Sequence, residues 1–224
     1  MTERQALIEH LSQFALEGRW QLLQEKVGWR TKHIALILED IYQPQNASAV
    51  LRTADCFGIQ DVHIVEDRNE YEVNPDVALG SSNWVSMQKY ENIETCIQQV
   101  KEKGYRVVAT SPLQNAVPIS DFDVSRPFAL MFGTEKRGLS EKAFSLADER
   151  VYIPMYGFTE SFNISVSAAI CCHEFSERLR RSTVDWKLSP EEAEDVLLNW
   201  LRVSVRSSAQ IEARFLKEFK SKNP

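Results

Sequence analysis

Apolar residues follow two different spacings near the start of the chain. Between residues 3 and 27 they recur at near-helical intervals, for example at Leu7, Leu11 and Phe14, and this pattern predicts one amphipathic helix. Residues 34–38 are instead five consecutive apolar residues. Such a run is typical of a strand that is buried on both faces.

The alternation of strand-like and helix-like segments continues to residue 181. Residues 74–85 have no clear period and are interpreted as loop with short structured pieces. Strands that alternate with helices at this spacing predict an α/β fold, a mostly parallel sheet with helices on both faces. The further predicted strands are residues 62–65, 106–110, 127–132 and 151–153, and the predicted helices are residues 46–57, 92–103, 140–147 and 163–181.

The last part of the chain is predicted to be helical. Ser189 is a suitable N-cap, Pro190 stands at the first helical position, and Glu192 follows three residues after the cap. This helical pattern extends to about residue 219, with a break near 207–208. We therefore expect an N-terminal helical extension (1–33), an α/β domain (34–181) and a C-terminal helical extension (182–224).

The charge is unevenly distributed along the 224 residues. The net charge is −6, but residues 34–173 hold 11 Lys and Arg against 19 Asp and Glu, a net of −8, and each tail is +1. A local basic cluster can bind phosphate whatever the total charge. Arg178, Arg180 and Arg181 form such a cluster, although a solvated helix face explains them equally well.

Cysteine and histidine usage argues against metal and disulfide chemistry. The four cysteines show no CxxC spacing, and the four histidines are scattered. This pattern favours reduced, interior thiols and predicts no metal site. The sequence has no apolar run of the roughly 20 residues that a membrane span needs, and its polar N-terminus lacks the apolar core of a signal peptide. We expect a cytoplasmic protein without membrane contact.

Glycines mark where a ligand site is expected. The segment after the first strand, residues 39–44, has no glycine, so a dinucleotide-binding fingerprint is absent, as are a P-loop and a GxSxG elbow. Glycines come later, at Gly133, Gly138 and Gly157. Gly133 directly follows a predicted strand, at a point where the backbone must approach a ligand closely.

Three segments of the chain resemble the motifs of one enzyme class. Residues 46–52 read Asn-x5-Arg, residues 132–138 read FGxExxG, and residues 153–165 read IPMxGxxxSxNxS. In order and spacing they resemble the SPOUT class of RNA methyltransferases, and within it the TrmH family of tRNA 2′-O-ribose methyltransferases. The similarity extends from about residue 34 to 176, and the terminal helices also resemble those of the tRNA-specific members.

The resemblance implies a fold, a cofactor and an assembly. Members have a C-terminal trefoil knot in the α/β domain that binds S-adenosylmethionine. They are homodimers, with the active site at the dimer interface. Their reaction transfers a methyl group to a ribose hydroxyl and needs no metal.

The first motif implies two catalytic residues. Arg52 would lie at the ribose 2′-oxygen and an adjacent phosphate, and Asn46 would orient Arg52 or the RNA. Arg52 is either the general base or a positioning and electrostatic group; a guanidinium is rarely deprotonated, which makes the second role chemically easier. The alternative is an ordinary surface arginine beside Asp55.

The other two motifs imply three more catalytic residues and the cofactor site. Glu135 would support the Arg52 region or an RNA contact, unless it only binds loop amides. Ser161 and Asn163 would present polar groups at a helix N-terminus, where Asn163 can also be a simple N-cap. Phe162 replaces the family's leucine. The candidates for lining the cofactor site are Thr110, Gly133, Ile153, Met155 and Phe162.

The resulting hypothesis is S-adenosylmethionine-dependent 2′-O-ribose methylation of tRNA, at the D-loop guanosine 18. Lys and Arg of residues 1–33 and 178–222 would contact tRNA phosphates. Alternatives are methylation of rRNA or of another tRNA nucleotide, and a catalytically silent RNA-binding relative. A generic doubly wound α/β binding protein is a further alternative, which binding of S-adenosylhomocysteine would exclude.

Overall fold

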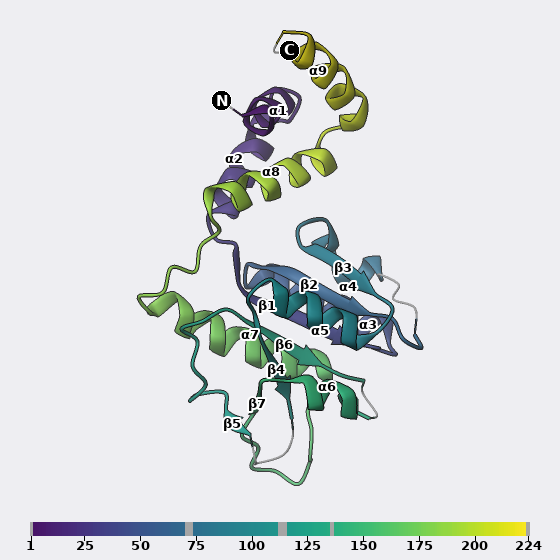
Figure 1. Ribbon diagram of the computed structural model, residues 1–224, viewed down its shortest axis with the longest axis vertical. Helices are drawn as coiled ribbons and strands as arrows, with labels where there is room; N and C mark the ends of the chain where they lie inside the picture. The colour runs from purple at the N-terminus through teal and green to yellow at the C-terminus, as the bar shows by residue number, and fades with distance from the viewer. Residues whose placement is uncertain (1, 70–73, 112–115, 135–136, 223–224) are drawn as a thin grey trace. The chain divides into compact units, whose positions relative to one another are not determined.

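The computed structural model describes residues 2–69, 74–111, 116–134 and 137–222, and the chain forms two compact units. One unit, Thr31–Trp186, contains a β-sheet, and the other combines Met1–Arg30 with Lys187–Pro224 and is helical (Figure 1). No helix in the described residues is long and apolar enough to cross a membrane.

The sheet has seven strands in the order β3-β2-β1-β6-β4-β7-β5, and every pairing is parallel. Ile34 of β1 pairs with Phe128 of β6 and Leu38 with Phe132, and β6 is the middle strand of the sheet. This confirms the predicted parallel α/β fold. The strands are β1 (Thr31–Glu39), β2 (Ile59–Val65), β3 (Ser86–Tyr90), β4 (Arg106–Thr110), β5 (Val117–Pro118), β6 (Phe128–Phe132) and β7 (Glu149–Tyr152).

Helices cover both faces of the sheet because successive side chains of a strand point to opposite sides. Leu36 and Leu38 of β1 belong to the core cluster that includes residues of α3 and α7, whereas Ala35 and Ile37 belong to the cluster with α5 and α6. The helices of this unit are α3 (Pro44–Cys56), α4 (Pro75–Ala78), η1 (Ser81–Asn83), α5 (Ile93–Glu102), α6 (Glu141–Leu146) and α7 (Ile164–Arg181).

The outer strands β3 and β5 were not predicted from the sequence. In β3, only Tyr90 is buried, and the other four residues are polar or partly exposed. β5 has two residues, one of them Pro118. Edge strands bury too little apolar surface to leave a clear periodic pattern.

The helical unit corrects the prediction of one helix over residues 3–27. Two helices occur, and the second begins after Leu16, which is extended (ψ 138°) and lacks a side-chain cap. Phe14, which lies between the two helices and matches the helical spacing, is 53% exposed. Its place in the apolar pattern therefore does not reflect burial on a continuous helix. The break predicted near residue 207 is confirmed, with Ser207 at φ 59°. The helices are α1 (Glu3–Ser12), α2 (Glu17–Val27), α8 (Pro190–Ser204) and α9 (Ser208–Lys222).

Caps explain where several helices begin. The predicted capping box at Ser189 is present, with Ser189 Oγ accepting from Glu192 N–H and the Glu192 side chain accepting from Ser189 N–H. Thr2 and Gln5 form a second capping box on α1. Each box satisfies two helix-terminal amides that would otherwise lack partners.

Candidate functional site

A cavity of about 460 Å³ lies at the carboxyl ends of β4, β6 and β7. Thr110 ends β4, Gly133 follows β6, and Ile153 follows β7, and all three line it. Ligands of open parallel α/β sheets characteristically bind at this edge. The volume lies within the range of roughly 300–1,000 Å³ that small-molecule sites occupy.

All five residues predicted to line a cofactor site lie around this cavity. They come from three separate stretches of the chain, and they are Thr110, Gly133, Ile153, Met155 and Phe162. The Thr110 hydroxyl donates to the backbone oxygen of Met131 (2.7 Å), which joins the ends of β4 and β6. Phe162 is 43% exposed, so part of its ring is available to a ligand.

Gly133 is required by a close approach of the chain to itself. A Cβ atom at this position would lie 2.2 Å from the carbonyl group of Gly138 and from the Leu139 nitrogen. Backbone bonds close the same loop, because Thr134 N–H donates to Gly138 O (3.0 Å) and Gly138 N–H to Thr134 O (2.9 Å). The glycine thus permits the tight loop that forms one wall of the cavity.

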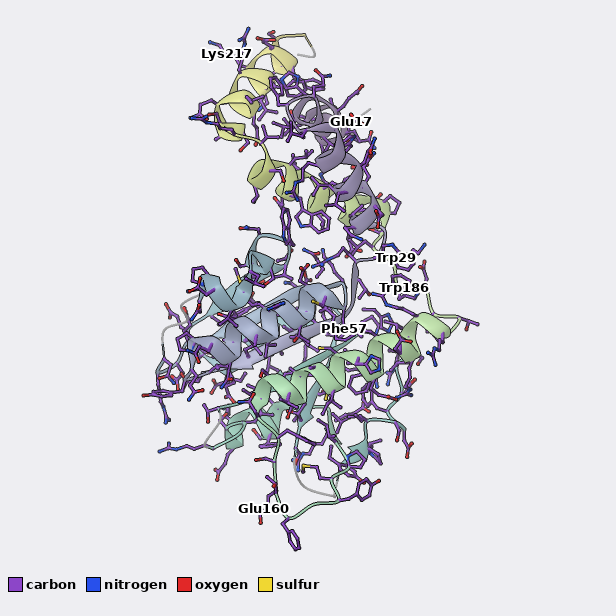
Figure 2. All side chains as sticks on the ribbon, turned by 180° about the vertical axis from the view of Figure 1, so that it is seen from behind. Glu17, Trp29, Phe57, Glu160, Trp186 and Lys217 are labelled. Atoms are coloured by element: carbon purple, nitrogen blue, oxygen red, sulfur yellow. The ribbon has the colours of Figure 1, made fainter. Side chains whose placement is uncertain are left out.

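The described lining of the cavity includes two charged residues, Arg137 and Glu160. Glu160 lies on the loop between β7 and α7 (Figure 2). Cys171 also lines the cavity, and burial raises the pKa of its thiol to about 12. The thiol is therefore protonated at neutral pH and is a poor nucleophile.

A hydrogen bond connects the first and third sequence segments. Asn163 is the N-cap of α7, where its Oδ1 accepts from Ser165 N–H (2.8 Å) and Ser165 Oγ (2.6 Å). Its Nδ2 donates to Oδ1 of Asn46, 3.2 Å away. Asn46 is 8% exposed and donates in turn to Gln43 Oε1. Capping and contact with the first segment therefore coexist at Asn163.

Arg52 lies apart from Asn46 on the same helix. Six residues of α-helix separate two side chains by about 9 Å along the axis and place them on different faces. Asn46 is accordingly buried and Arg52 exposed. Arg52 forms no hydrogen bond or ion pair with a residue that the structure describes, and Asp55 is not its partner. Among the described residues lining the cavity, Arg52 does not occur.

The remaining catalytic candidates are Ser161 and Glu135. Ser161 is exposed and lines the cavity. Glu135 lies outside the described residues. The loop that carries it is described on both sides, where Arg137 N–H donates to the Thr134 hydroxyl (3.1 Å).

The arginines at the end of α7 have structural partners. Arg178 donates to the backbone oxygens of Ile119 (2.7 Å) and Phe122 (2.6 Å). Arg180 donates to Phe57 O (2.8 Å) and lies 4.8 Å from the Trp186 ring centroid; Figure 2 labels both partners. Two of the three arginines of the expected phosphate-binding cluster therefore hold structural hydrogen bonds, and Arg181 remains exposed.

Several residues around the cavity escaped the sequence analysis. One group, Ile164, Ser167 and Cys171, follows the three- and four-residue spacing of a helix face on α7, so helical periodicity could have identified it. Ser111 and Ile119 lie before and after a stretch that is only partly described, and no local pattern marks them.

The cysteines correct one detail of the prediction. Cys96, Cys171 and Cys172 are buried, but Cys56 is exposed. Burial also raises the pKa of Cys96 to about 12. In the described residues, no group of three or more His, Cys, Asp or Glu side chains could hold a metal ion.

Comparison with known proteins yields named relatives. A tRNA (guanosine(18)-2′-O)-methyltransferase of Borreliella burgdorferi is 40% identical over 202 residues, which cover 90% of this chain and 93% of that protein. The crystal structure of an A. aeolicus TrmH/SpoU tRNA modifying enzyme superposes with a TM-score of 0.78 at 27% identity, covering 85% of this chain and 98% of that one.

A third comparison is an AdoMet-bound rRNA methyltransferase from Sinorhizobium meliloti. Its TM-score is 0.59 at 25% identity, and the match covers 67% of this chain and 58% of that one. The model of the SpoU rRNA Methylase family matches residues 33–173, which include all of the sheet except the first two residues of β1, the cavity, Asn46 and Asn163. The chain belongs to the SpoU rRNA Methylase family.

Proposed function

We propose that the protein transfers a methyl group from S-adenosylmethionine to the ribose 2′-oxygen of guanosine 18 in the tRNA D-loop. The observation that carries this proposal is the cavity of about 460 Å³ at the strand ends, whose wall joins the second and third motif segments. The 40% identical relative, named for this reaction, supports the choice of nucleotide. Such an enzyme acts in the cytoplasm, where its substrate is.

The cavity suits S-adenosylmethionine in size and in chemistry. Apolar side chains and strand-end backbone would hold its adenosine part, with Thr110, Gly133, Ile153, Met155 and Phe162 around it. Arg137 and Glu160 offer one charge of each sign, as the zwitterionic amino-acid end requires. The tight loop at Gly133 supplies a wall of backbone, and a side chain at this position would collide with the backbone of Gly138 and Leu139.

The proposed reaction would move the methyl group from the sulfonium to the ribose oxygen, with S-adenosylhomocysteine as the leaving group and the hydroxyl proton released to solvent. S-adenosylmethionine supplies an already activated methyl group when bound. The protein aligns the ribose and promotes loss of the hydroxyl proton. Arg52 binds the neighbouring phosphate and stabilises the developing alkoxide, because a guanidinium provides several charged donors in a fixed plane.

Asn46 and Asn163 support this arrangement through the hydrogen bond between them. The bond between Asn163 Nδ2 and Asn46 Oδ1 ties the start of α7 to the start of α3. Ser161 stands two residues before Asn163, at the rim of the cavity. The pair therefore sets the position of the loop that presents Ser161 relative to the helix that carries Arg52. Glu135 lies outside the described residues, and the second motif alone supports the proposal that it assists the Arg52 region or an RNA contact.

We also propose that the active protein is a homodimer with a trefoil-knotted cofactor site. Within one chain, Arg52 is absent from the described lining of the cavity. Its helix α3 packs on α7, where Val166 is 43% exposed and Ile170 is half-buried. A second copy that covers this face would bring its own Arg52 towards the cavity of the first.

Complementation tests the shared site. Arg52→Ala is expected to lose most of its activity and Gly133→Val all of it, the second because its Cβ collides with the loop backbone. Co-expressed with different tags, the two variants would form mixed dimers with one intact site, and activity would return. Activity that stays absent in purified mixed dimers would place both groups of one site in a single chain.

The substrate is tested with defined RNAs. We expect tritium from labelled S-adenosylmethionine in unmodified tRNA and none in rRNA fragments. Calorimetric titration with S-adenosylhomocysteine provides a separate reading of the cofactor site. Label in rRNA alone would favour the rRNA alternative, and cofactor binding without transfer to any RNA would favour a silent RNA-binding relative.

A further inference from the structure

The carboxyl end of β1 carries a buried acid that none of the three motif segments includes. Glu39 is 6% exposed. One carboxylate oxygen accepts from Ser140 N–H (2.8 Å) and the other from the Ser140 hydroxyl (2.6 Å). The two residues are 101 positions apart in the sequence. A buried carboxylate is tolerated only where such donors pair with it.

Ser140 connects Glu39 to the start of a helix and to the end of the loop before it. Its hydroxyl oxygen also accepts from Ala143 N–H (3.0 Å), which makes Ser140 the N-cap of α6. The loop before it is closed by the paired backbone groups of Thr134 and Gly138. We call residues 133–134 and 137–140 the partition segment.

The partition segment separates two cavities. One is the cavity of about 460 Å³ described above, and the other, of about 1010 Å³, extends towards β2, α5 and α6. Both are lined by the same stretch, Thr134, Arg137, Gly138 and Leu139. A shift of this segment would therefore change the shape of the smaller cavity directly.

The next residue, Asp40, anchors a different loop. Asp40 has a positive φ of 53°, and its carboxylate accepts from the backbone N–H groups of Arg68 and Asn69 (2.8 Å each). The left-handed backbone at Asp40 turns the two neighbouring carboxylates to separate loops. Only Glu39 reaches the partition segment.

We propose that Glu39 is a positioning residue for the cofactor, acting through Ser140 on the partition segment. This inference rests on the proposed function, because it names S-adenosylmethionine as the ligand of the smaller cavity. Glu39 touches no reacting atom in this account. It holds the wall against which the cofactor binds.

The primary test compares Glu39→Ala, Ser140→Ala and Ser140→Thr by calorimetric titration with S-adenosylhomocysteine. Loss of a hydrogen bond to a charged group predicts roughly 10- to 100-fold weaker binding in Glu39→Ala. Ser140→Ala should weaken binding less, because the backbone N–H still reaches Glu39. Ser140→Thr keeps the hydroxyl and should restore binding.

Two readouts separate positioning from general stability. Ser189→Ala, which removes the equivalent serine cap from α8, should lower the melting temperature and leave S-adenosylhomocysteine affinity unchanged. Amide exchange over residues 137–146 of the cofactor-free protein should accelerate in Glu39→Ala, with exchange over residues 190–204 unaltered. Glu39→Gln, nearly identical in shape, replaces Glu39→Ala if the latter does not fold.

The outcomes distinguish this inference from the proposed function. Wild-type protein that binds no S-adenosylhomocysteine contradicts the proposed function. If the wild type binds S-adenosylhomocysteine, and Glu39→Ala and Ser140→Ala both bind it with wild-type affinity, the positioning role alone is contradicted. Equal weakening in Ser140→Ala and Ser140→Thr also contradicts it, because the hydroxyl would then not be the connecting group.

Discussion

Two places on the packed pair α3 and α7 carry arginines that differ in their partners. On α3, Arg52 is exposed and has no polar partner among the described residues. At the end of α7, Arg178 and Arg180 donate to three backbone oxygens. Burial lowers the pKa of the Arg180 guanidinium, and the aromatic ring of Trp186 lies beside it.

The contrast fits two roles for arginines of this chain, the proposed ligand binding at Arg52 and structural hydrogen bonding at Arg178 and Arg180. A guanidinium that already donates to carbonyl oxygens has fewer donors left for phosphate, whereas no described residue accepts from the Arg52 guanidinium. Substitutions at the two places should therefore have opposite consequences. Arg52 variants should lose activity and keep stability, and Arg178 variants should lose stability first.

The largest effect is expected for Arg52→Ala. Removing a group that stabilises developing negative charge lowers kcat/KM by about 10²–10³. The melting temperature and the affinity for S-adenosylhomocysteine should stay at wild-type values. Arg52→Lys is the matched control: it keeps the charge but not the planar fork, so it should recover only part of the rate. A lowered melting temperature in Arg52→Ala would remove the contrast with α7.

Arg178→Met should mainly reduce the free energy of unfolding. The oxygens of Ile119 and Phe122 lose charged donors, each worth about 1.5–3 kcal/mol. Denaturant unfolding measures the loss, and activity per folded molecule should stay close to wild type. Activity that falls further than stability would mean that Arg178 also contacts RNA.

Lowering the pH tests the stability of the sheet through a buried histidine, because arginine stays charged over this pH range. Burial lowers the pKa of His63 from 6.5 to about 4, and its Nδ1 lies 2.9 Å from the Tyr90 hydroxyl. Between these pH values the unfolded chain binds a proton that the folded chain does not, so stability falls as pH falls. At pH 5 the loss relative to pH 7 is about 2 kcal/mol. Between pH 7 and pH 5 the melting temperature of His63→Gln should fall less than that of the wild type. An equal fall would show that His63 is not the cause of the pH dependence.

A smaller effect is expected where the two helices are tied together. Asn163→Ser keeps a cap on α7 but removes the donor to Asn46. Loss of this hydrogen bond should lower the free energy of unfolding by about 0.5–1.5 kcal/mol. It should also reduce methyl transfer, because the loop that carries Ser161 is no longer tied to α3. Asn163→Ala should add the loss of the cap, about 1 kcal/mol of unfolding free energy. Equal activity of Asn163→Ser and wild type would limit Asn163 to capping.

Arg181→Ala is the smallest change and the internal control. Arg181 is exposed and pairs with Glu177 across one helical turn (2.9 Å). Such pairs contribute less than about 0.5 kcal/mol. Stability and activity should both remain at wild-type values, and a strong fall in tRNA affinity would restore the phosphate-binding role for this one arginine.

The sequence predicted best where burial is complete. Residues 34–38 identified β1 because both faces of the strand are covered. β3 was missed because its exposed edge has no apolar period, and α1 and α2 were merged because Phe14 matched the helical spacing without being buried. The spacing of apolar residues reflects which side chains are buried, so a helix or strand that buries few side chains has no clear apolar spacing.

For the candidate site, the sequence supplied residues but not their relations. Asn46 and Asn163 were both chosen, but their bond spans 117 positions and follows only from the packing of α3 on α7. Glu39 belongs to a strand end with no motif, and its partner Ser140 was expected only at the start of a helix. The arginines at 178–181 were interpreted by charge alone, which does not reveal the carbonyl oxygens that bind them.

Mapping the transferred methyl group shows whether the protein methylates the ribose of guanosine 18. Two tRNA transcripts are compared, one with guanosine at position 18 and one with 2′-deoxyguanosine there, using tritiated S-adenosylmethionine and nuclease digestion. We expect label on a 2′-O-methylguanosine in the first transcript with wild-type protein, its loss with Arg52→Ala, and none in the second transcript. Equal labelling of both transcripts would contradict methylation of the ribose at guanosine 18.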